Sequence, residues 1–169
     1  MAEELHLDGV VWHHRFQGAF INDKRMHGYL RTMAEYNLPA FIHIIADSTM
    51  ESPTGLESLA EQHPEITFVA LDGFSGMPQS KTIMGIAKRC PNILFDTAIV
   101  FPLGGILEEF VAQVGSERLI FGTDLYLYPE ASYHYPHVLY EILEAPTLTE
   151  RDKQNIFWNN ARKLFHWEK

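Results

Sequence analysis

Five short apolar runs recur along this chain and constrain its fold more than any other feature. They cover residues 9–14, 40–45, 66–71, 92–100 and 118–123. The runs are nearly continuous in apolar character and do not alternate with polar residues, which is typical of strands buried on both faces of a parallel sheet. Their centres lie roughly 25 to 31 residues apart, the length of a strand–helix unit. The pattern therefore predicts an α/β fold with about five parallel strands.

Helical periodicity fills the intervals between these runs. Apolar residues recur at helical spacing in the segments 25–36, 55–63, 79–89 and 105–115. The chain then continues with three further helical segments, 134–143, 149–158 and 159–167. Thr149 and Asp152 form a variant of the capping box, with Asp in the place of the usual Glu. We expect each strand to be followed by a helix, with additional helices at the C-terminus.

Two architectures accommodate five consecutive strand–helix units: an open doubly wound sheet and part of a (β/α)8 barrel. A doubly wound sheet normally carries a Gly-rich phosphate loop after its first strand, whereas this chain reads VVWHHRFQG over residues 10–18. This difference favours the barrel. A closed barrel needs about 250 residues, and the chain has 169. We therefore expect a partial TIM-barrel-like fold, formed by one domain over residues 1–169.

Composition and charge limit the partners of the chain. The formal net charge of -9 argues against nucleic acid and anionic membrane surfaces, which both demand a basic face. Cys90 is the sole cysteine, so no intrachain disulfide can form, and we interpret it as a structural thiol. The N-terminus lacks the pattern of a secretory signal, and no apolar run approaches the ~20 residues of a membrane span. The expected location is the cytoplasm.

Ionisable side chains follow or end each apolar run. Because the carboxyl ends of parallel strands meet at one rim, these side chains are expected to share one site. Imidazoles and carboxylates together suit a divalent metal or general acid–base chemistry. In chain order they are His13, His14 and Arg15; His43; Asp72; Asp96 with Thr97; and Asp124.

Structural interpretations stand beside the functional one. His43 lies within an apolar run and could be a core histidine bonded to a backbone carbonyl. Asp124 could cap the following segment through backbone N–H groups, and Asp72 before Gly73 could serve a turn. His13 and His14 could be edge-strand histidines without a chemical role.

Several segments resemble the amidohydrolase superfamily, in its amidohydrolase-related branch. They are FGTD (121–124), NLPAFIHI (37–44), HPEITFVALDGFSG (63–76), CPNILFDTA (90–98) and NNARKLF (159–165). That branch contains hydrolases, lactonases and decarboxylases built on a TIM barrel. The resemblance implies that this chain corresponds to the C-terminal part of the family barrel, beginning at its fourth strand.

The resemblance also implies roles for individual residues. His43 corresponds to a metal-ligand histidine, and Asp124 to the carboxylate that binds metal and accepts a proton from the attacking water. Asp72 stands where the family has a further histidine and is a candidate third ligand. The His-x-His pair of the family's first strand has no counterpart here. His13 and Arg15 are the candidate substrate-binding residues, and the implied cofactor is a divalent metal, zinc.

The function implied by this resemblance is metal-dependent hydrolysis of a small organic acid, amide or lactone. A decarboxylase of the same family and a non-catalytic subunit that acts in binding or assembly are the alternatives. The loops after Asp72 and Asp124 are expected to select the substrate. Five strands leave two edges, 9–14 and 118–123, without the Lys or Pro that usually protect edges. We therefore expect a homo-oligomer.

Overall fold

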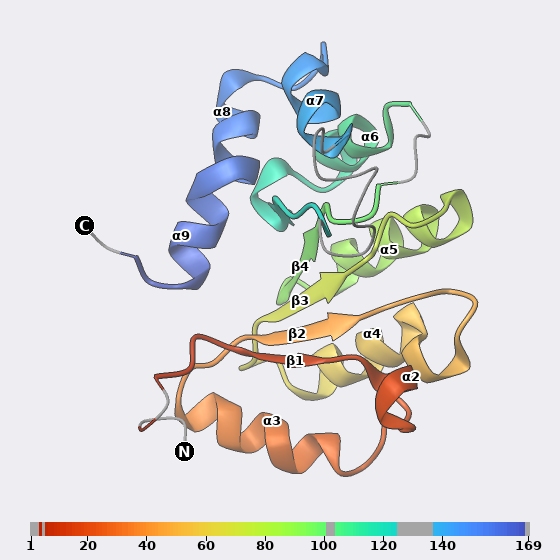
Figure 1. The fold of residues 1–169 in the computed structure, drawn as a ribbon, viewed down its shortest axis with the longest axis vertical. Helices are drawn as coiled ribbons and strands as arrows, with labels where there is room; N and C mark the ends of the chain where they lie inside the picture. The colour runs from red at the N-terminus through yellow and green to blue at the C-terminus, as the bar shows by residue number, and fades with distance from the viewer. Residues whose placement is uncertain (1–3, 5, 101–103, 125–136, 168–169) are drawn as a thin grey trace.

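The computed structural model describes residues 4, 6–100, 104–124 and 137–167. Its five strands form a single, entirely parallel sheet in chain order, which confirms the predicted α/β fold (Figure 1). A doubly wound sheet would reverse its strand order at a switch point, and this sheet does not. The strands are β1 (Val10–Trp12), β2 (Ala40–His43), β3 (Phe68–Leu71), β4 (Ile93–Asp96) and β5 (Leu119–Ile120).

Helices follow the strands much as the periodicity predicts. The capping box of Thr149 and Asp152 is present at the start of α8. Within the described ranges no helix is long and apolar enough to cross a membrane. The helices are α2 (His14–Gln17), α3 (Met26–Glu35), α4 (Pro53–Gln62), α5 (Met77–Arg89), α6 (Ile106–Gln113), α7 (His137–Glu144), α8 (Glu150–Gln154) and α9 (Asn160–Leu164), with the short turns η1 (Thr49–Glu51) and η2 (Ser116–Arg118) and the π-helical turn η3 (Asn155–Asn159).

The two faces of the sheet are buried to different extents. The helix-facing side is fully buried and forms the core, with Ile42, Phe68 and Phe95 all 0% exposed. The residues between them, such as Val11 and Val69, point to the opposite face, which corresponds to the interior of a barrel. Val69 is 1% exposed there, but Val11 at the β1 edge is 57% exposed. The expectation of strands buried on both faces therefore holds at the centre of the sheet and not at β1.

The C-terminal helical segment folds back onto the sheet. The ring of Phe165 stacks on that of Phe41 in β2, with centroids 6.1 Å apart. Beside β5, the backbone N–H of Phe121 donates to the carbonyl of Ile156 at 3.0 Å, and Phe121 packs edge-on against Phe157. Both edges were expected to be bare, and for β5 this expectation is wrong because η3 lies against it. Figure 1 shows α9 beyond the amino ends of the strands.

Replacing Phe110 tests the apolar core between the helices and the sheet. Phe110 is 0% exposed and packs edge-on against Phe74 and Phe95, at centroid distances of 5.4 and 5.5 Å. Phe110→Ala should lower the free energy of unfolding by about 3–5 kcal/mol, because it removes a buried ring and leaves a cavity. Urea unfolding followed by circular dichroism measures this change. Phe16→Ala, at a 77% exposed position, should cost less than about 1 kcal/mol; equal losses would contradict this description of the core.

Candidate functional site

The carboxyl ends of the strands form one rim that carries the predicted ionisable groups. His13 follows β1, His43 ends β2, Asp72 follows β3, and Asp96 ends β4. Asp124 follows β5, four residues beyond its last strand residue. Asp72 and Asp124 both adopt left-handed backbone angles, with φ of 63° and 48°. Such angles are uncommon outside glycine and are best tolerated by Asn and Asp, so the chain turns sharply at both carboxylates.

His43 is held in a single orientation by the neighbouring strand. Its Nδ1 lies 3.0 Å from the carbonyl oxygen of Trp12. A carbonyl can only accept, so Nδ1 carries the proton and Nε2 keeps its lone pair. Nε2 lies 4.0 Å from Oδ2 of Asp72. The backbone contact that the structural interpretation of His43 anticipated is thus present. Metal-ligand histidines are oriented by the same kind of contact, and here it leaves Nε2 facing the carboxylate of Asp72.

Asp72 and Asp96 form a buried pair of carboxyl groups. The backbone N–H of Asp72 donates to Oδ1 of Asp96 at 3.0 Å. Burial raises the pKa of Asp72, the nearby His43 opposes this rise, and the charge of Asp124 adds to it. Burial, followed by the negative charge of Asp72, raises the pKa of Asp96 to about 8. Negative charge is therefore crowded at this rim, and a cation or a proton must compensate it.

Gln79 supports the same rim from the first turn of α5. Its amide nitrogen donates to the backbone carbonyls of Asp72 and Ile44, at 2.8 and 3.1 Å. Its amide oxygen accepts from the backbone N–H of Ala46 at 2.5 Å. This buried side chain thereby joins the loops that follow β2 and β3. The sequence analysis missed Gln79, because a single Gln in a helical segment gives no sign of hydrogen bonds to residues 33 and 35 positions away.

His13 and Arg15, the candidate substrate-binding residues, meet at a buried carboxylate. Nδ1 of His13 lies 2.5 Å from Oε1 of Glu51, and the backbone N–H of Arg15 donates to the same oxygen at 3.1 Å. The ring of His13 stacks on that of His43, with centroids 4.1 Å apart and planes 10° apart. Glu51 is 0% exposed and was not identified from the sequence, since it lies in the turn η1, 38 residues after His13.

The three candidate metal ligands are brought to one rim but do not all meet. His43 and Asp72 form a pair, and the pKa rise that Asp124 causes at Asp72 places its charge nearby. Among the described residues, however, the one group of three whose ligand atoms lie within 4.8 Å of one another is Glu57, Glu61 and Cys90. That group lies on the helical layer, where Arg89 already pairs with Glu57 at 2.6 Å.

A divalent metal fits the donor set at the rim. Zinc binds imidazole nitrogen and carboxylate oxygen at about 2.0–2.2 Å, so the 4.0 Å between His43 and Asp72 is a span that one ion can bridge. The lone pair of His43 is available. Burial raises the pKa of Asp72, and a bound cation would offset this cost of keeping the carboxylate ionised. Asp124 has to come closer to complete such a group. Its following segment, which should take part in substrate selection, lies outside the described residues.

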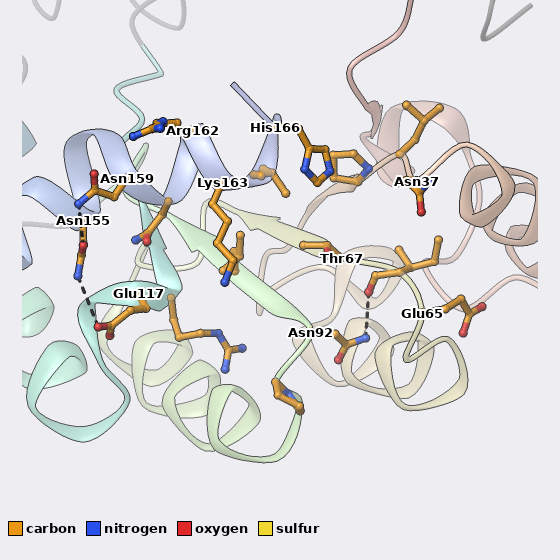
Figure 2. A pocket seen from close by; sticks show the side chains of 18 of the residues that line it. Asn37, Glu65, Thr67, Asn92, Glu117, Asn155, Asn159, Arg162, Lys163 and His166 are labelled. Carbon is orange, nitrogen blue, oxygen red and sulfur yellow. Dashed lines mark hydrogen bonds between the residues drawn. The ribbon is translucent and has the colours of Figure 1, made fainter. Parts of the chain in front are cut away.

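A cavity of about 930 Å3 lies at the opposite end of the strands, between their amino ends and α9 (Figure 2). Its polar lining is largely committed to holding the fold. The guanidinium of Arg118 donates to the carbonyls of Ala87, Cys90 and Ile93, and the amide of Asn92 donates to three further backbone carbonyls. The thiol of Cys90, whose carbonyl accepts from Arg118, is buried, in agreement with its structural interpretation. The size of this cavity therefore does not identify the chemical site.

Known proteins resemble this chain over most of its length. The family model described as amidohydrolase matches residues 1–167. A curated relative, the protein fluG of Emericella nidulans, is 35% identical over 85 residues, which are 47% of this chain and 10% of that protein.

Two solved structures show the same fold around a metal. A dihydroxybenzoic acid decarboxylase from Polaromonas with bound manganese has a TM-score of 0.70 and 14% identity, over 99% of this chain and 63% of that one. An amidohydrolase from Burkholderia multivorans with bound zinc has a TM-score of 0.67 and 11% identity, over 86% and 58%. This chain therefore spans about three fifths of the length of the solved structures it resembles.

Metal titration tests the rim directly. In isothermal titration calorimetry with Mn2+ or Zn2+, His43→Ala should weaken binding by at least about tenfold, since it removes a ligand together with its oriented lone pair. His27→Ala is the matched control, because His27 bonds to His63 on the helical layer, at 2.8 Å. Equal affinity of the two variants would exclude His43 as a ligand.

Proposed function

Because this chain belongs to the amidohydrolase family, we propose that it carries a metal-dependent hydrolase site for a small organic acid, amide or lactone. The observation that supports the proposal most is the pairing of His43 and Asp72 at the carboxyl rim. His43, Asp72 and Asp124 would hold the metal, and zinc is the ion we propose. When bound, a divalent metal acidifies a water molecule, lowering its pKa toward about 7, and polarises a carbonyl oxygen.

The residues of the chain itself have distinct roles in this proposal. Asp124, on its sharp turn at the rim, accepts the proton of the attacking water. His43 cannot take that proton at Nδ1, which is bonded to the Trp12 carbonyl. Arg15 supplies a guanidinium for the carboxylate of the substrate, and His13 contacts the substrate beside it.

Decarboxylation is the second candidate activity. It is suggested by the presence of a decarboxylase with bound manganese among the solved structures that share this fold. Both activities need a metal and a group that binds a carboxylate, so the rim described above serves either. Product analysis separates them, because decarboxylation releases CO2 and hydrolysis does not.

The site is incomplete if it is judged by the length of its relatives. The chain spans about three fifths of the solved structures it resembles, and the barrel-interior face is open to solvent at Val11. We propose that a second copy of the chain covers this face in a homo-oligomer. A subunit that acts only in binding or assembly remains the alternative to catalysis, and the absence of turnover from a metal-loaded oligomer would favour it.

Asp124→Asn tests the proposed base. The substitution keeps the size of the side chain and removes its ability to accept a proton. Turnover of a lactone, amide or aromatic acid by the metal-loaded protein should fall by about 10²–10⁴-fold, the range for loss of a general base. Asp8→Asn, at an exposed position before β1, is the control and should retain activity. Unchanged turnover by Asp124→Asn would remove Asp124 from the mechanism.

Light scattering tests the assembly. Exposed apolar surface favours association by about 25 cal/mol per Å2 that is buried. We expect a mass of at least twice the 19.4 kDa of one chain at micromolar concentration. A monomer of 19.4 kDa would contradict the proposal and would assign the covering of the interior face to the C-terminal helices alone.

A further inference from the structure

Glu51 is a fully buried carboxylate that neither the family match nor the proposed function uses. It ends the turn η1 and is 0% exposed. It does not cap the helix that follows, because the hydroxyl of Ser52 accepts the N–H of Gly55 there. A carboxylate removed from water needs compensating partners, so its position must be explained by the groups around it.

Those groups are the two candidate substrate-binding residues. His13 bonds through Nδ1 to Oε1 of Glu51 at 2.5 Å, and the backbone N–H of Arg15 donates to the same oxygen. Nε of Arg15 lies 3.5 Å from Oε2, within ion-pair distance. One carboxylate therefore holds both residues, which lie at the end of β1 and the start of α2.

The contact also fixes which nitrogen of His13 is available. An ionised carboxylate only accepts hydrogen bonds, so Nδ1 of His13 is the donor, and in the neutral ring Nε2 then carries a lone pair. Within the described residues, Nε2 makes no hydrogen bond. His43 has the same arrangement, with Nδ1 bonded to a carbonyl and Nε2 facing Asp72. The two rings are stacked 4.1 Å apart, so orienting His13 also packs a fixed ring against His43.

A purely structural joint between α2 and η1 is the competing explanation. Such a joint is usually as stable or more stable when it is built from apolar side chains. Here, among the described residues, three buried polar atoms have no hydrogen-bond partner: Nδ1 and Nε2 of His14, and Oε2 of Glu51. Folds tolerate unsatisfied groups of this kind mainly at functional sites. Oε2 belongs to the carboxylate that holds His13, and His14 is the next residue in the chain.

We propose that Glu51 is a positioning residue, which holds His13 with Nε2 as a hydrogen-bond acceptor and keeps Arg15 beside it as a donor. The inference rests on the proposed function, because it assigns Glu51 to the same substrate site. A pair of this kind suits a ligand with a hydroxyl for His13 and a carboxylate for Arg15.

Two variants of the full chain separate positioning from structure. Glu51→Met keeps the length of the side chain and removes both acceptor atoms, whereas Glu51→Gln keeps one acceptor. Long-range 1H–15N spectra of the imidazole rings, assigned with His13→Asn, report the tautomer. Wild type and Glu51→Gln should show His13 protonated at Nδ1, and Glu51→Met should shift it toward Nε2. His63, whose Nδ1 bonds to Glu65 at 3.0 Å, is the internal reference and should not change.

Binding of two matched probes gives a readout that a structural role would not alter. Mandelate and phenylacetate differ by one hydroxyl. Calorimetry measures the affinity of the Mn2+-loaded protein for each of them. Wild type and Glu51→Gln should prefer mandelate by about tenfold, the value of one hydrogen bond, and Glu51→Met should lose this preference. His13→Asn should lose it as well, so the test survives if Glu51→Met fails to fold.

The outcomes separate this inference from the proposed function. Any of three results would overturn the role of Glu51. The first two are His13 protonated at Nδ1 in folded Glu51→Met and His13 protonated at Nε2 in wild type. The third is equal affinity of wild type for the two probes. Mn2+ affinity should be the same in wild type and Glu51→Met, because Glu51 is not a ligand. If wild type binds no Mn2+ and yet shows the predicted tautomer change, the proposed function fails and the role of Glu51 stands.

Discussion

Parallel pairing of the strands in chain order is the constraint on which the rest of this structure depends. It sends one set of side chains, including Ile42 and Phe68, under the helices, and it ends every strand at the same rim. Residues that are distant in sequence therefore share that rim, where the carboxyl groups of Asp72 and Asp96 are buried and the charge of Asp124 acts on Asp72. Burial, followed by the negative charge of Asp72, raises the pKa of Asp96 to about 8. A bound cation would compensate the negative charge of the carboxylates at this rim.

The sequence predicted the architecture well because its signal is local. Apolar runs and helical periodicity specify the order and type of the elements, and the absence of a Gly-rich loop after the first strand favoured a barrel segment over a doubly wound sheet. The predicted strands were too long: residues 92–100 yielded a strand that ends at Asp96. Glu51 and Gln79 could not be found in this way, because most of their partners lie more than 30 residues away and no short pattern surrounds them. Asp124 was correctly placed at the rim, but its distance from His43 depends on a turn that periodicity does not describe.

The contacts that support the site are local. The chain spans about three fifths of the solved structures it resembles, and within that span His43 is bonded to Trp12 and Asp72 to Gln79. These contacts join neighbouring strands and the loops between them, so they do not need a closed barrel. The C-terminal segment adds to this independence by lying against β5 and stacking Phe165 on the interior face. What the five strands lack is cover for that face near β1.

The central claim is that the carboxyl rim binds a divalent metal through His43 and the carboxylates around it. Crystals grown with Mn2+ and measured at the manganese absorption edge test this claim most directly, since anomalous scattering locates the ion without reference to activity. The account predicts one strong peak within about 2.0–2.4 Å of Nε2 of His43 and in contact with Asp72. A peak at Glu57, Glu61 and Cys90 with none at the rim would contradict it.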